Sequence, residues 1–426
     1  MALFSGALGA QQPKIFAILD IGSSKVVCFI GQQEAGTDVR ILGAGFHASA
    51  GLKAGAVIDM EAAEYTIRHA VEKAERAAGF AIQSVIVNIS SRSLTSHHIN
   101  VESKFSSAEI ADKNLRRVIE MAMAEFAEPD QAILHALPLN WTLDGERGIR
   151  DPRGMYGSNL GVGMHFVTAN VGVLRNLSHC IERCHLRIEG MVASPYAAGE
   201  AVLVDDELDL GVTLIDMGAG ITTAAVFRDR TLAFVATVGV GGKNMTSDIA
   251  RGLTTPWEAA ERIKAIYGSA MESQNDDSQM VPCPPMGAED ELHHEPLSSL
   301  TGIVRSRIEE TFEILRNRFN DAGIGDFAGR RIVLTGGAAQ LTGAVPLAEH
   351  IFAKRVRIGA PHGLLGLPET MVGPDFAVAA GLMKQVFQDK TEAITGPPDL
   401  SGRRIRQRRY AGGSVLRSLR WFKDNF

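Results

Sequence analysis

The sequence predicts an α/β protein built from two related domains that face each other across a cleft. The first observation is a strand–turn–strand pattern, FAILDIGSSKVVCFI at residues 16–30, in which Asp20 ends one apolar run and a small polar turn precedes the next. The second is the return of this pattern as LIDMGAGITTAAVF at residues 214–227, with Asp216 in the equivalent position. Either copy alone fits a glycine-rich hairpin with a solvated acid, because short glycine motifs are common. The repetition favours duplicated units, and 426 residues suffice for two domains with separate cores.

The two turns have the composition of phosphate-binding loops. Consecutive backbone N–H groups in a turn form a concave surface of donors for phosphate oxygens, and glycine allows the phosphate to come close. Serine and threonine hydroxyls add further donors. The residues predicted to hold phosphates are Gly22, Ser23, Ser24 and Lys25 in the first turn, and Gly218, Ala219, Gly220 and Thr222 in the second.

The two acids predict a divalent cation beside those phosphates. Mg²⁺ prefers carboxylate and water oxygens and usually keeps several of its waters. Asp20 and Asp216 would supply carboxylates from opposite sides of the cleft, so we expect them to hold Mg²⁺ through water. Together the turns and the acids predict a site for a nucleoside triphosphate.

The composition is that of an ordinary soluble globular protein, with 45% hydrophobic and 22% charged residues. The four cysteines, at positions 28, 180, 184 and 283, are too few and too scattered for a disulfide framework, which favours a reducing compartment. Cys180 and Cys184 have histidine neighbours, but no second ligand pair follows at a metal-binding spacing, so we expect ordinary thiols. The N-terminus lacks the features of a signal peptide, and no run of about eighteen apolar residues predicts a membrane-spanning helix.

After the first hairpin the pattern alternates between helices and strands. A helix over residues 59–79 has apolar residues at helical spacing and ends at Gly79, which suits a left-handed C-terminal position. The later elements of this half are, in order, a strand over 84–90, a polar insertion of strands and helix over 91–166, a helix over 172–186 and a helix from about Pro195.

From residue 211 the second half repeats the plan. We expect a helix in TPWEAAERIKAIYG, with Thr255 as its N-cap and Pro256 in its first turn. Glu258 would complete a capping box, and Gly268 would end the helix. Residues 269–299 are acidic and proline-rich and are expected to form a loop.

The last part of the second half is predicted to be a strand, a glycine turn and a helix over residues 331–352. The turn at Gly336 and Gly337 is a third candidate contact for the nucleotide. Residues 388–413 contain adjacent prolines and several glycines, a composition that predicts a flexible linker.

The C-terminal tail carries charge of the opposite sign from the body. The whole chain has a net charge of −6, whereas residues 403–426 contain seven arginines, Lys423 and Asp424. Residues 414–426, SVLRSLRWFKDNF, would place bulky apolar side chains on one side of a helix and arginines opposite, which is typical of an anchor on anionic lipid. The alternative is a terminal helix packed on the protein's own core. The expected membrane contacts are Val415, Leu416, Leu419, Trp421, Phe422 and Phe426.

Several strings, in this order and at these separations, resemble the actin/Hsp70/sugar-kinase ATPase superfamily: DIGSS, DMGAGITT, VGGKNMTSDIA, AERIK, LTGGAAQL and GPDFAVAAGLM. Within it, the chain is similar to the FtsA family of bacterial cell-division proteins over nearly its whole length. This likeness rests on ISSRSLTSHHI, TPWEAAERIKAIYGSA, LTGGAAQLTGAVPLAEHIF and the tail. It implies an actin-like two-domain ATPase fold in which subdomain 1C replaces subdomain 1B, followed by a C-terminal amphipathic helix.

The resemblance implies the following boundaries. Subdomain 1A takes residues 13–87 and 167–208, 1C takes 88–166, 2A takes 209–245 and 329–387 (with the return to 1A), 2B takes 246–328, the linker takes 388–413 and the membrane-targeting helix takes 414–426.

The resemblance also implies an ATP-binding protein that polymerises on the inner membrane, anchors the FtsZ ring and helps recruit the division machinery. It would be a peripheral protein on the cytoplasmic face of the inner membrane, at the division site. Its implied partners are the FtsZ C-terminal tail, further copies of itself, anionic lipids and, through residues 88–166, downstream division proteins; no nucleic acid is expected. The alternatives are a small-molecule kinase and a pilus-assembly ATPase of the same superfamily.

The resemblance adds further nucleotide contacts. Glu261 and Lys264, three residues apart on one helical face, match the superfamily's ribose and adenine contacts. The alternative is an exposed helix pair worth a few tenths of a kcal/mol. The other implied contacts are small residues, namely Gly336, Gly337 and Ala338 against the adenosine, and Gly241 and Gly242.

Ser194 stands where hydrolytic members of the superfamily carry a glutamate before proline that helps position the attacking water. Serine cannot act as a carboxylate base near neutral pH, and hydrolysis needs a group that orients or deprotonates water. We therefore expect ATP binding with, at most, slow hydrolysis. Asp216 is the candidate catalytic residue.

The FtsZ tail is expected on subdomain 2B. There the helix in LTGIVRSRIEETFEILRNRF is expected to expose Arg305 and Arg307, which could pair with an acidic peptide. Arg307 is the candidate contact. The alternative is a solvated helix face on which nearby glutamates pair with both arginines.

Overall fold

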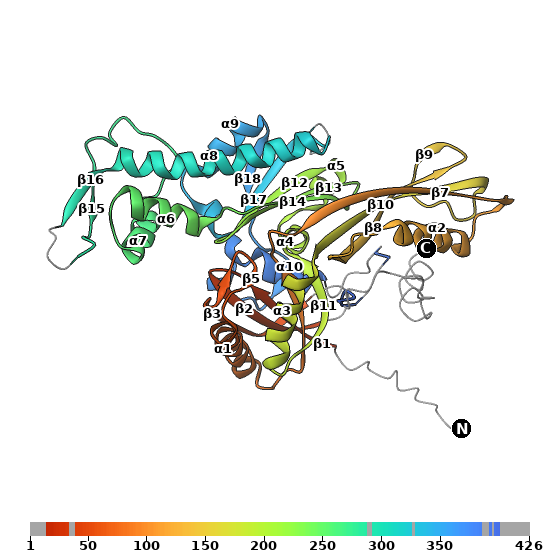
Figure 1. Ribbon diagram of the computed structural model, residues 1–426, viewed down its shortest axis with the longest axis horizontal. Helices are drawn as coiled ribbons and strands as arrows, with labels where there is room; N and C mark the ends of the chain where they lie inside the picture. The colour runs from red at the N-terminus through yellow and green to blue at the C-terminus, as the bar shows by residue number, and fades with distance from the viewer. Residues whose placement is uncertain are drawn as a thin grey trace, which may run out of the picture.

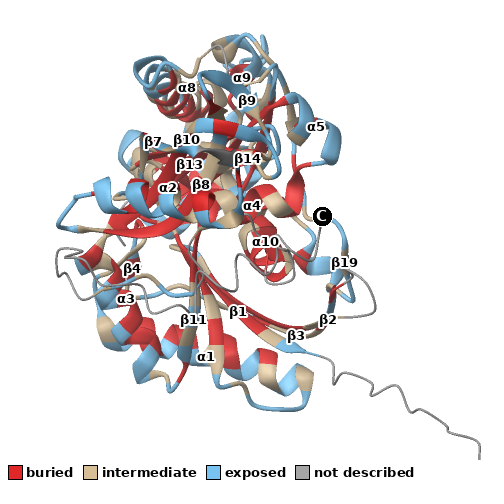
Figure 2. Cartoon of the chain, turned by 90° about the vertical axis from the view of Figure 1, so that its right-hand side faces the viewer, coloured by how far each residue is buried: buried red, intermediate tan, exposed pale blue. Residues whose placement is uncertain are grey.

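The computed structural model describes residues 14–33, 39–287, 292–325, 329–385, 392, 393 and 396–400. This part of the chain contains two large mixed sheets with helices packed on them, and two arms that extend from them in opposite directions (Figure 1). Figure 2 shows that buried residues follow the strands of the sheets, where the main hydrophobic clusters lie.

The sheet of the first domain has six strands in the order β11-β6-β1-β2-β3-β19. Strand β1 pairs antiparallel with β2 on one side and parallel with β6 on the other. The bounds are β1 (Ile15–Ile21), β2 (Lys25–Gln33), β3 (Val39–Ala48), β6 (Ser84–Ile89), β11 (Arg187–Ala193) and β19 (Leu364–Leu365).

The sheet of the second domain repeats this topology. Its order is β14-β13-β12-β17-β18, and β12 pairs antiparallel with β13 and parallel with β17. The bounds are β12 (Val212–Met217), β13 (Thr222–Arg228), β14 (Thr231–Val238), β17 (Arg331–Thr335) and β18 (Arg355–Ile358). The outer pairings match as well, since β2–β3 and β13–β14 are antiparallel whereas β6–β11 and β17–β18 are parallel. The predicted pair of related α/β domains is confirmed.

Helices flank both sheets. Helix α1 (Met60–Ala78) starts where Asp59 accepts a hydrogen bond from the Ala62 amide and ends at Gly79, whose φ of 84° is left-handed, as the sequence predicts. The other helices of the two domains are α3 (Val171–Arg183), α4 (Ser194–Val202), α5 (Asp205–Leu210), α9 (Ala344–Phe352) and α10 (Ala377–Gln385), with short 3-10 turns η1 (Gly337–Gln340), η2 (Glu369–Met371) and η3 (Pro374–Phe376). A small hairpin, β4 (Leu52–Lys53) with β5 (Ala56–Val57), precedes α1.

The insertion forms one arm. It is a four-stranded antiparallel sheet, β7-β10-β8-β9, covered by one helix and filled by a core of its own around Trp141 and Phe166 (Figure 1). Its inner end contacts the edge of the second sheet, where His98 and His165 lie within hydrogen-bonding distance of the carbonyls of Ala233 and Leu232. The bounds are β7 (Thr95–Glu109), α2 (Asp112–Glu125), β8 (Gln131–Leu143), β9 (Glu146–Ile149) and β10 (Tyr156–Asn170).

The opposite arm differs from the prediction at two points. The region 269–299, expected to be a loop, contains a two-stranded sheet formed by β15 (Met280–Cys283) and β16 (His293–Pro296). Thr255 is not the N-cap of α7 (Trp257–Tyr267), because Pro256, with ψ of 152°, takes the non-helical cap position. The Thr255 hydroxyl donates instead to the carbonyl of Pro284. The other helices here are α6 (Gly242–Gly252) and α8 (Leu297–Asp321).

The last described residues also differ from the prediction. The sequence predicts a flexible linker over residues 388–413. Within it, however, Glu392 is buried, and the Ala393 amide donates to the carbonyl of Ala136 on β8. Residues 414–426, and with them the whole expected membrane face, lie outside the described residues. Within the described part of the chain, no helix is both long and apolar enough to cross a membrane. All four cysteines are free thiols, and no cluster of three or more metal-binding side chains occurs among the described residues.

Candidate functional site

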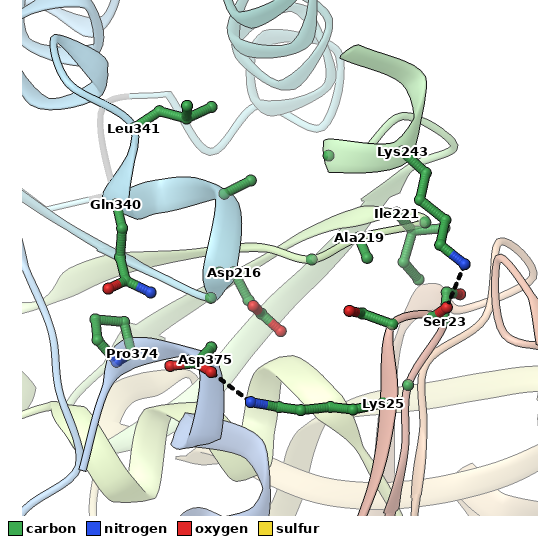
Figure 3. A pocket seen from close by; sticks show the side chains of 18 of the residues that line it. Ser23, Lys25, Asp216, Ala219, Ile221, Lys243, Gln340, Leu341, Pro374 and Asp375 are labelled. Carbon is green, nitrogen blue, oxygen red and sulfur yellow. Dashed lines mark hydrogen bonds and ion pairs between the residues drawn. The ribbon is translucent and has the colours of Figure 1, made fainter. Parts of the chain in front are cut away.

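A cavity of about 720 Å³ lies where the first and second domains meet. The turns of both repeated hairpins form its floor, and α7, η1 and the start of η3 complete its walls. Figure 3 shows the side chains of Ser23 and Lys25 facing Asp216 and Asp375 across it. Its size is within the range of sites that bind small molecules.

The first hairpin presents backbone donors to this cavity. Strands β1 and β2 stay paired up to Ile21 and Val26, and the Gly22 amide donates to the Lys25 carbonyl at 3.0 Å. Among the described residues, the amides of Ser23 and Ser24 have no hydrogen-bond acceptor. Backbone N–H groups normally have a hydrogen-bond partner. These two have none in the part of the chain that the structure describes, so they are available to donate to a bound anion.

The second hairpin has the same geometry. The Gly218 amide donates to the Ile221 carbonyl at 3.0 Å, and the amides of Ala219 and Gly220 have no acceptor within the described part of the chain. The two turns are also in close contact, since a Cβ atom at Gly220 would lie 2.5 Å from the Ser23 hydroxyl oxygen. Glycine at this position allows the turns to approach without displacing Ser23, and the residues of both turns line the same cavity.

Asp20 and Asp216 are the next-to-last residues of the equivalent strands β1 and β12, and they line the same cavity. Burial raises the pKa of Asp20 from its ordinary value of 3.8 to about 7; the Asp216 carboxylate raises it as well, while Lys25 lowers it. Asp216 keeps part of its surface open to the cavity, yet withdrawal from bulk water raises its pKa to about 6. Two acids held in this state are suited to a divalent cation, whose charge would favour their ionised forms.

Cationic side chains bridge the cavity. The Lys25 ammonium forms an ion pair with Asp375 and lies 3.2 Å from the centre of the Phe376 ring. Lys243, at the start of α6, donates to the carbonyl of Ser23 at 2.7 Å and so joins the second domain to the first turn. Both contacts are drawn in Figure 3. Neither Lys243 nor Asp375 was singled out from the sequence.

The third glycine turn forms the wall opposite the first hairpin. Gly336 has a φ of 86°, and a Cβ atom there would lie 2.4 Å from Asp216 Oδ1. The Gly336 amide donates to the carbonyl of Pro374 at 3.1 Å, which ties this turn to the segment that carries Asp375. Glycine at this position therefore keeps the space around Asp216 open.

Glu261 and Lys264 lie on the α7 face toward the cavity, but they form more than an exposed helix pair. The Lys264 ammonium is 2.8 Å from Glu261 Oε2 and donates to the Thr246 hydroxyl at 2.7 Å and to the Gly242 carbonyl at 3.2 Å. Its side chain is 13% exposed, whereas that of Glu261 is 51% exposed. Lys264 thus joins α7 to the start of α6, and Glu261 keeps the more open position at the cavity.

Most of the residues predicted to bind nucleotide line the cavity, and two do not. The Thr222 hydroxyl donates to the carbonyl of Val240, behind the turn. Gly241 lies against the carbonyls of Gly218 and Ala219 and brings the start of α6 close to the second hairpin. Lining residues that sequence reasoning did not assign include Asn88, Lys243, Trp257, Gln340 and Asp375.

Ser194 is buried at the back of the cavity. Its hydroxyl oxygen accepts a hydrogen bond from Asn88 Nδ2 at 3.1 Å, and Asn88 Oδ1 accepts one from the Ile21 amide at 2.6 Å. Asn88 therefore links the start of α4 to the first hairpin. No carboxylate stands at the Ser194 position.

A second cavity of about 490 Å³ lies on the outer arm, between α6 and α8. Arg307 lines it and is paired with two acids, since its Nε is 2.6 Å from Asp248 Oδ2 and its Nη1 contacts Glu310. Arg305 does not line this cavity and pairs with Glu309 at 2.8 Å. The local acidic partners that the sequence left as the alternative are thus present at both arginines.

The duplicated sheets, the cavity between them and the inserted domain define an actin-like ATPase fold, and comparisons with known proteins agree. The family model described as "Cell division protein FtsA" matches residues 213–381, and a model described as "SHS2 domain inserted in FTSA" matches residues 91–168. The FtsA of Agrobacterium fabrum is 43% identical over 98% of this chain and 96% of its own length. That of Pseudomonas aeruginosa is 32% identical over 98% of this chain and 99% of its own. The chain belongs to the FtsA family of cell division proteins.

Solved structures show the same fold at low sequence identity. The chain matches a structure titled "PilM-PilN type IV pilus biogenesis complex" with a TM-score of 0.61 at 18% identity, over 88% of this chain and 98% of the other. It matches MreB 5 of Spiroplasma citri bound to AMPPNP with a TM-score of 0.53 at 12% identity, over 88% and 96% of the two chains. The predicted actin-like fold is confirmed.

Proposed function

We propose that this protein binds Mg·ATP in the cavity between its two domains, polymerises on the inner membrane and anchors the FtsZ ring during cell division. The observation that carries the nucleotide part is the contact between the two repeated turns. It brings to one cavity four backbone amides that have no acceptor among the described residues, together with the buried Asp20 and the half-buried Asp216. Membership of a cell-division family favours this function over a small-molecule kinase or a pilus-assembly ATPase.

The residues present fit the ligand. The amides of the two turns suit phosphate oxygens, and the Lys25 and Lys243 side chains add positive charge nearby. Asp20 and Asp216 would hold Mg²⁺, through water, from the two sides, and the cation would neutralise charge on the phosphates. Trp257, Glu261 and Lys264 lie on α7 at the wall where the nucleoside would be held. The structural relative titled as bound to AMPPNP supports a nucleotide site in this fold.

Calorimetric titration with Mg·ATP tests the site. Gly336→Val would fill the space beside Asp216, so we expect it to reduce affinity strongly, as should Asp216→Ala. Asp144→Asn is the control, because Asp144 bonds to Ser158 and Asn159 on the inserted domain, away from the cavity. Unchanged affinity in both cavity variants, with each variant folded, would disprove the assignment.

Turnover is expected to be slow, because Ser194 cannot act as a base and its oxygen already accepts a hydrogen bond from Asn88. A steady-state assay of phosphate release should give a rate below the range of about 1–10³ s⁻¹ that is typical of enzymes. A rate inside that range would contradict the proposal and favour a kinase.

We place the FtsZ tail at the outer-arm cavity, where Arg307 is the candidate contact. An acidic peptide would have to replace Asp248 or Glu310 as the partner of Arg307. The new ion pair between Arg307 and the peptide would therefore add little to the binding free energy. Arg307→Glu should weaken binding of an FtsZ tail peptide, measured by fluorescence anisotropy. Arg305→Glu, on the same helix but outside the cavity, is the matched control, and equal effects of the two changes would remove Arg307 from the interface.

Membrane attachment is assigned to residues 414–426, which lie outside the described residues. One short amphipathic helix binds lipid weakly, and a filament that presents many such helices would bind through their combined effective concentration. Sedimentation with anionic vesicles tests this. The full chain should sediment in a concentration- and ATP-dependent way, whereas the chain stopped after Gly413 and the Trp421→Glu variant should stay in solution. Sedimentation of the chain stopped after Gly413 would contradict the assignment.

A further inference from the structure

Part of the chain beyond α10 is docked in a seam between the inserted domain and the first domain. We call the described residues of this segment, 392, 393 and 396–400, the strap. Glu392 is 5% exposed and its carboxylate lies 3.0 Å from Nδ1 of His135, which is itself 2% exposed. The Ala393 amide donates to the carbonyl of Ala136 at 2.8 Å. One end of the strap is therefore fixed on β8 by both a side chain and the backbone.

The other end of the strap is fixed on the first domain. The Leu400 carbonyl accepts a hydrogen bond from Arg175 Nε on α3 at 2.7 Å, and Leu400 packs on the hydrophobic cluster of that domain. The described residues of the strap thus reach from the inserted domain to α3. Acidic side chains are rarely buried unless they are paired, and the Glu392–His135 contact is a buried pair that holds the start of the strap on β8.

His135 connects the strap to the nucleotide cavity. Its Nε2 accepts a hydrogen bond from the Ala193 amide at 3.0 Å, so its proton is on Nδ1 and is donated to Glu392. Ala193 is the last residue of β11, an edge strand, and the next residue is Ser194 at the back of the cavity. The ring of Tyr196 packs edge-on against His135, with ring centres 5.0 Å apart.

A second connection runs through α10, from which the strap continues. This helix packs along α4, where Gly381 lies against the carbonyl of Ala197. It begins directly after η3, which carries Asp375, the ion-pair partner of Lys25 in the cavity. The strap is therefore joined to the cavity from both directions, through α10 and through His135.

We propose that the seam is a docking site for the strap and that this docking relays the state of the nucleotide cavity to the strap, after which the C-terminal tail follows in the sequence. A shift at the start of α4 changes the position of the Ala193 amide and of His135, and the position of His135 determines how well Glu392 is held. This inference rests on the proposed nucleotide site, and it adds a route within one molecule that needs no filament.

Two truncations separate the strap from the tail. The chain stopped after Gly402 keeps the strap and lacks the tail, and the chain stopped after Lys390 lacks both. Hydrogen exchange with mass spectrometry of the peptide over residues 190–196 reports on the Ala193 amide. We expect exchange there to be about tenfold faster or more without the strap, because His135 loses the partner that fixes its ring. Equal exchange, within about twofold, in the two chains would overturn the relay.

Point variants test the same contact in the full chain. Glu392→Ala should speed exchange of the peptides over 190–196 and 392–400, whereas Glu392→Gln keeps an acceptor for His135 Nδ1 and should restore most of the protection. Mg·ATP should change exchange of the strap peptide by about fivefold or more in the wild type and not in Glu392→Ala. A strap peptide that is indifferent to bound Mg·ATP would overturn the relay.

Calorimetry on the chain stopped after Gly402 distinguishes the two proposals. If Mg·ATP does not bind, the proposed nucleotide function fails, while the comparison of the two truncations still decides whether the strap holds Ala193. If Mg·ATP binds and exchange at 190–196 is the same with and without the strap, the relay fails and the nucleotide function stands.

Discussion

The two hairpins share a backbone and differ in their side chains. In both, an aspartate is the next-to-last residue of the first strand, a glycine amide donates across the turn, and the two residues after that glycine line the cavity. The first turn adds two hydroxyls and the Lys25 ammonium, whereas the second adds two glycines and an alanine and lies against the start of α6. The backbone of the second turn can therefore be approached closely by a ligand, whereas the first turn supplies the positive charge of Lys25.

This difference shows how a duplicated unit becomes one site with two distinct halves. Gly220, which matches Ser24 of the first turn, has no side chain and leaves room for the Ser23 hydroxyl, so the two turns come into close contact. The acids differ too, because Asp20 is the more buried and has Asp216 facing it, and its pKa is the higher of the two. The variants below test this asymmetry.

The largest expected effect is on the stability of the nucleotide-free protein. Both acids have folded-state pKa values above 3.8, about 7 for Asp20 and about 6 for Asp216, so ionising them destabilises the fold. The penalty is complete above those values and falls away as the pH drops toward 3.8. Asp20→Asn should raise the free energy of unfolding at pH 8 by roughly 1–4 kcal/mol, and Asp216→Asn should raise it less.

Urea unfolding at pH 8 and pH 5 measures this. The gain from each asparagine should shrink at pH 5, and the two gains should become similar there. The account would be contradicted by an increase in the free energy of unfolding that does not change with pH, or by a larger increase for Asp216→Asn than for Asp20→Asn.

The second effect is on affinity. Carboxylates that hold a cation through its waters typically contribute about 10–100-fold to binding, so Asp20→Asn and Asp216→Asn should each weaken Mg·ATP by roughly that factor. The same changes that stabilise the empty protein should therefore impair binding. Calorimetry at a fixed Mg²⁺ concentration measures the affinity of each variant for Mg·ATP. A variant that is more stable than the wild type and binds Mg·ATP with unchanged affinity would show that its acid has no part in the site.

The third effect concerns the contact between the turns. Gly220→Ala places a methyl group 2.5 Å from the Ser23 hydroxyl oxygen, and we expect a cost of about 1–2 kcal/mol in the free energy of unfolding. Ser23→Gly in the same chain should recover part of this cost. Thermal or urea unfolding of the two single variants and the double variant provides the test, and strictly additive effects would mean that the turns do not touch.

The smallest effect is at Arg307, far from both hairpins. Its ion pairs with Asp248 and Glu310 are partly exposed, so Arg307→Ala should change the free energy of unfolding by only about 0.2–1 kcal/mol. Mg·ATP affinity should stay as in the wild type. A large loss of nucleotide affinity in this variant would contradict the separation of the two cavities.

The hairpins could be predicted from the sequence because their signal is local. An acid at the end of an apolar run, followed by glycine and another apolar run, identifies a strand, a turn and a strand without any knowledge of the rest of the chain. The same holds for α1, whose first and last residues, Asp59 and Gly79, both have local cap geometry. The repeat then supplied the overall plan.

The missed features depend on contacts between distant segments. Asp375 is 350 residues from Lys25, and Lys243 is 220 residues from Ser23, so no spacing rule connects them. Thr222 has the right residue type for a phosphate contact, but its hydroxyl is used by Val240. The strap was assigned to a linker because its prolines and glycines dominate the composition, whereas the buried Glu392–His135 pair that holds it gives no local signal.

The most direct test is hydrogen exchange of both turns in one experiment. The peptides over residues 20–26 and 216–223 contain the four acceptor-free amides of Ser23, Ser24, Ala219 and Gly220. If one nucleotide is held by both hairpins, saturating Mg·ATP should slow exchange in both peptides together, and Asp216→Asn should reduce the protection of both. Protection of one turn alone, or of neither, would contradict a nucleotide site formed jointly by the two halves of the chain.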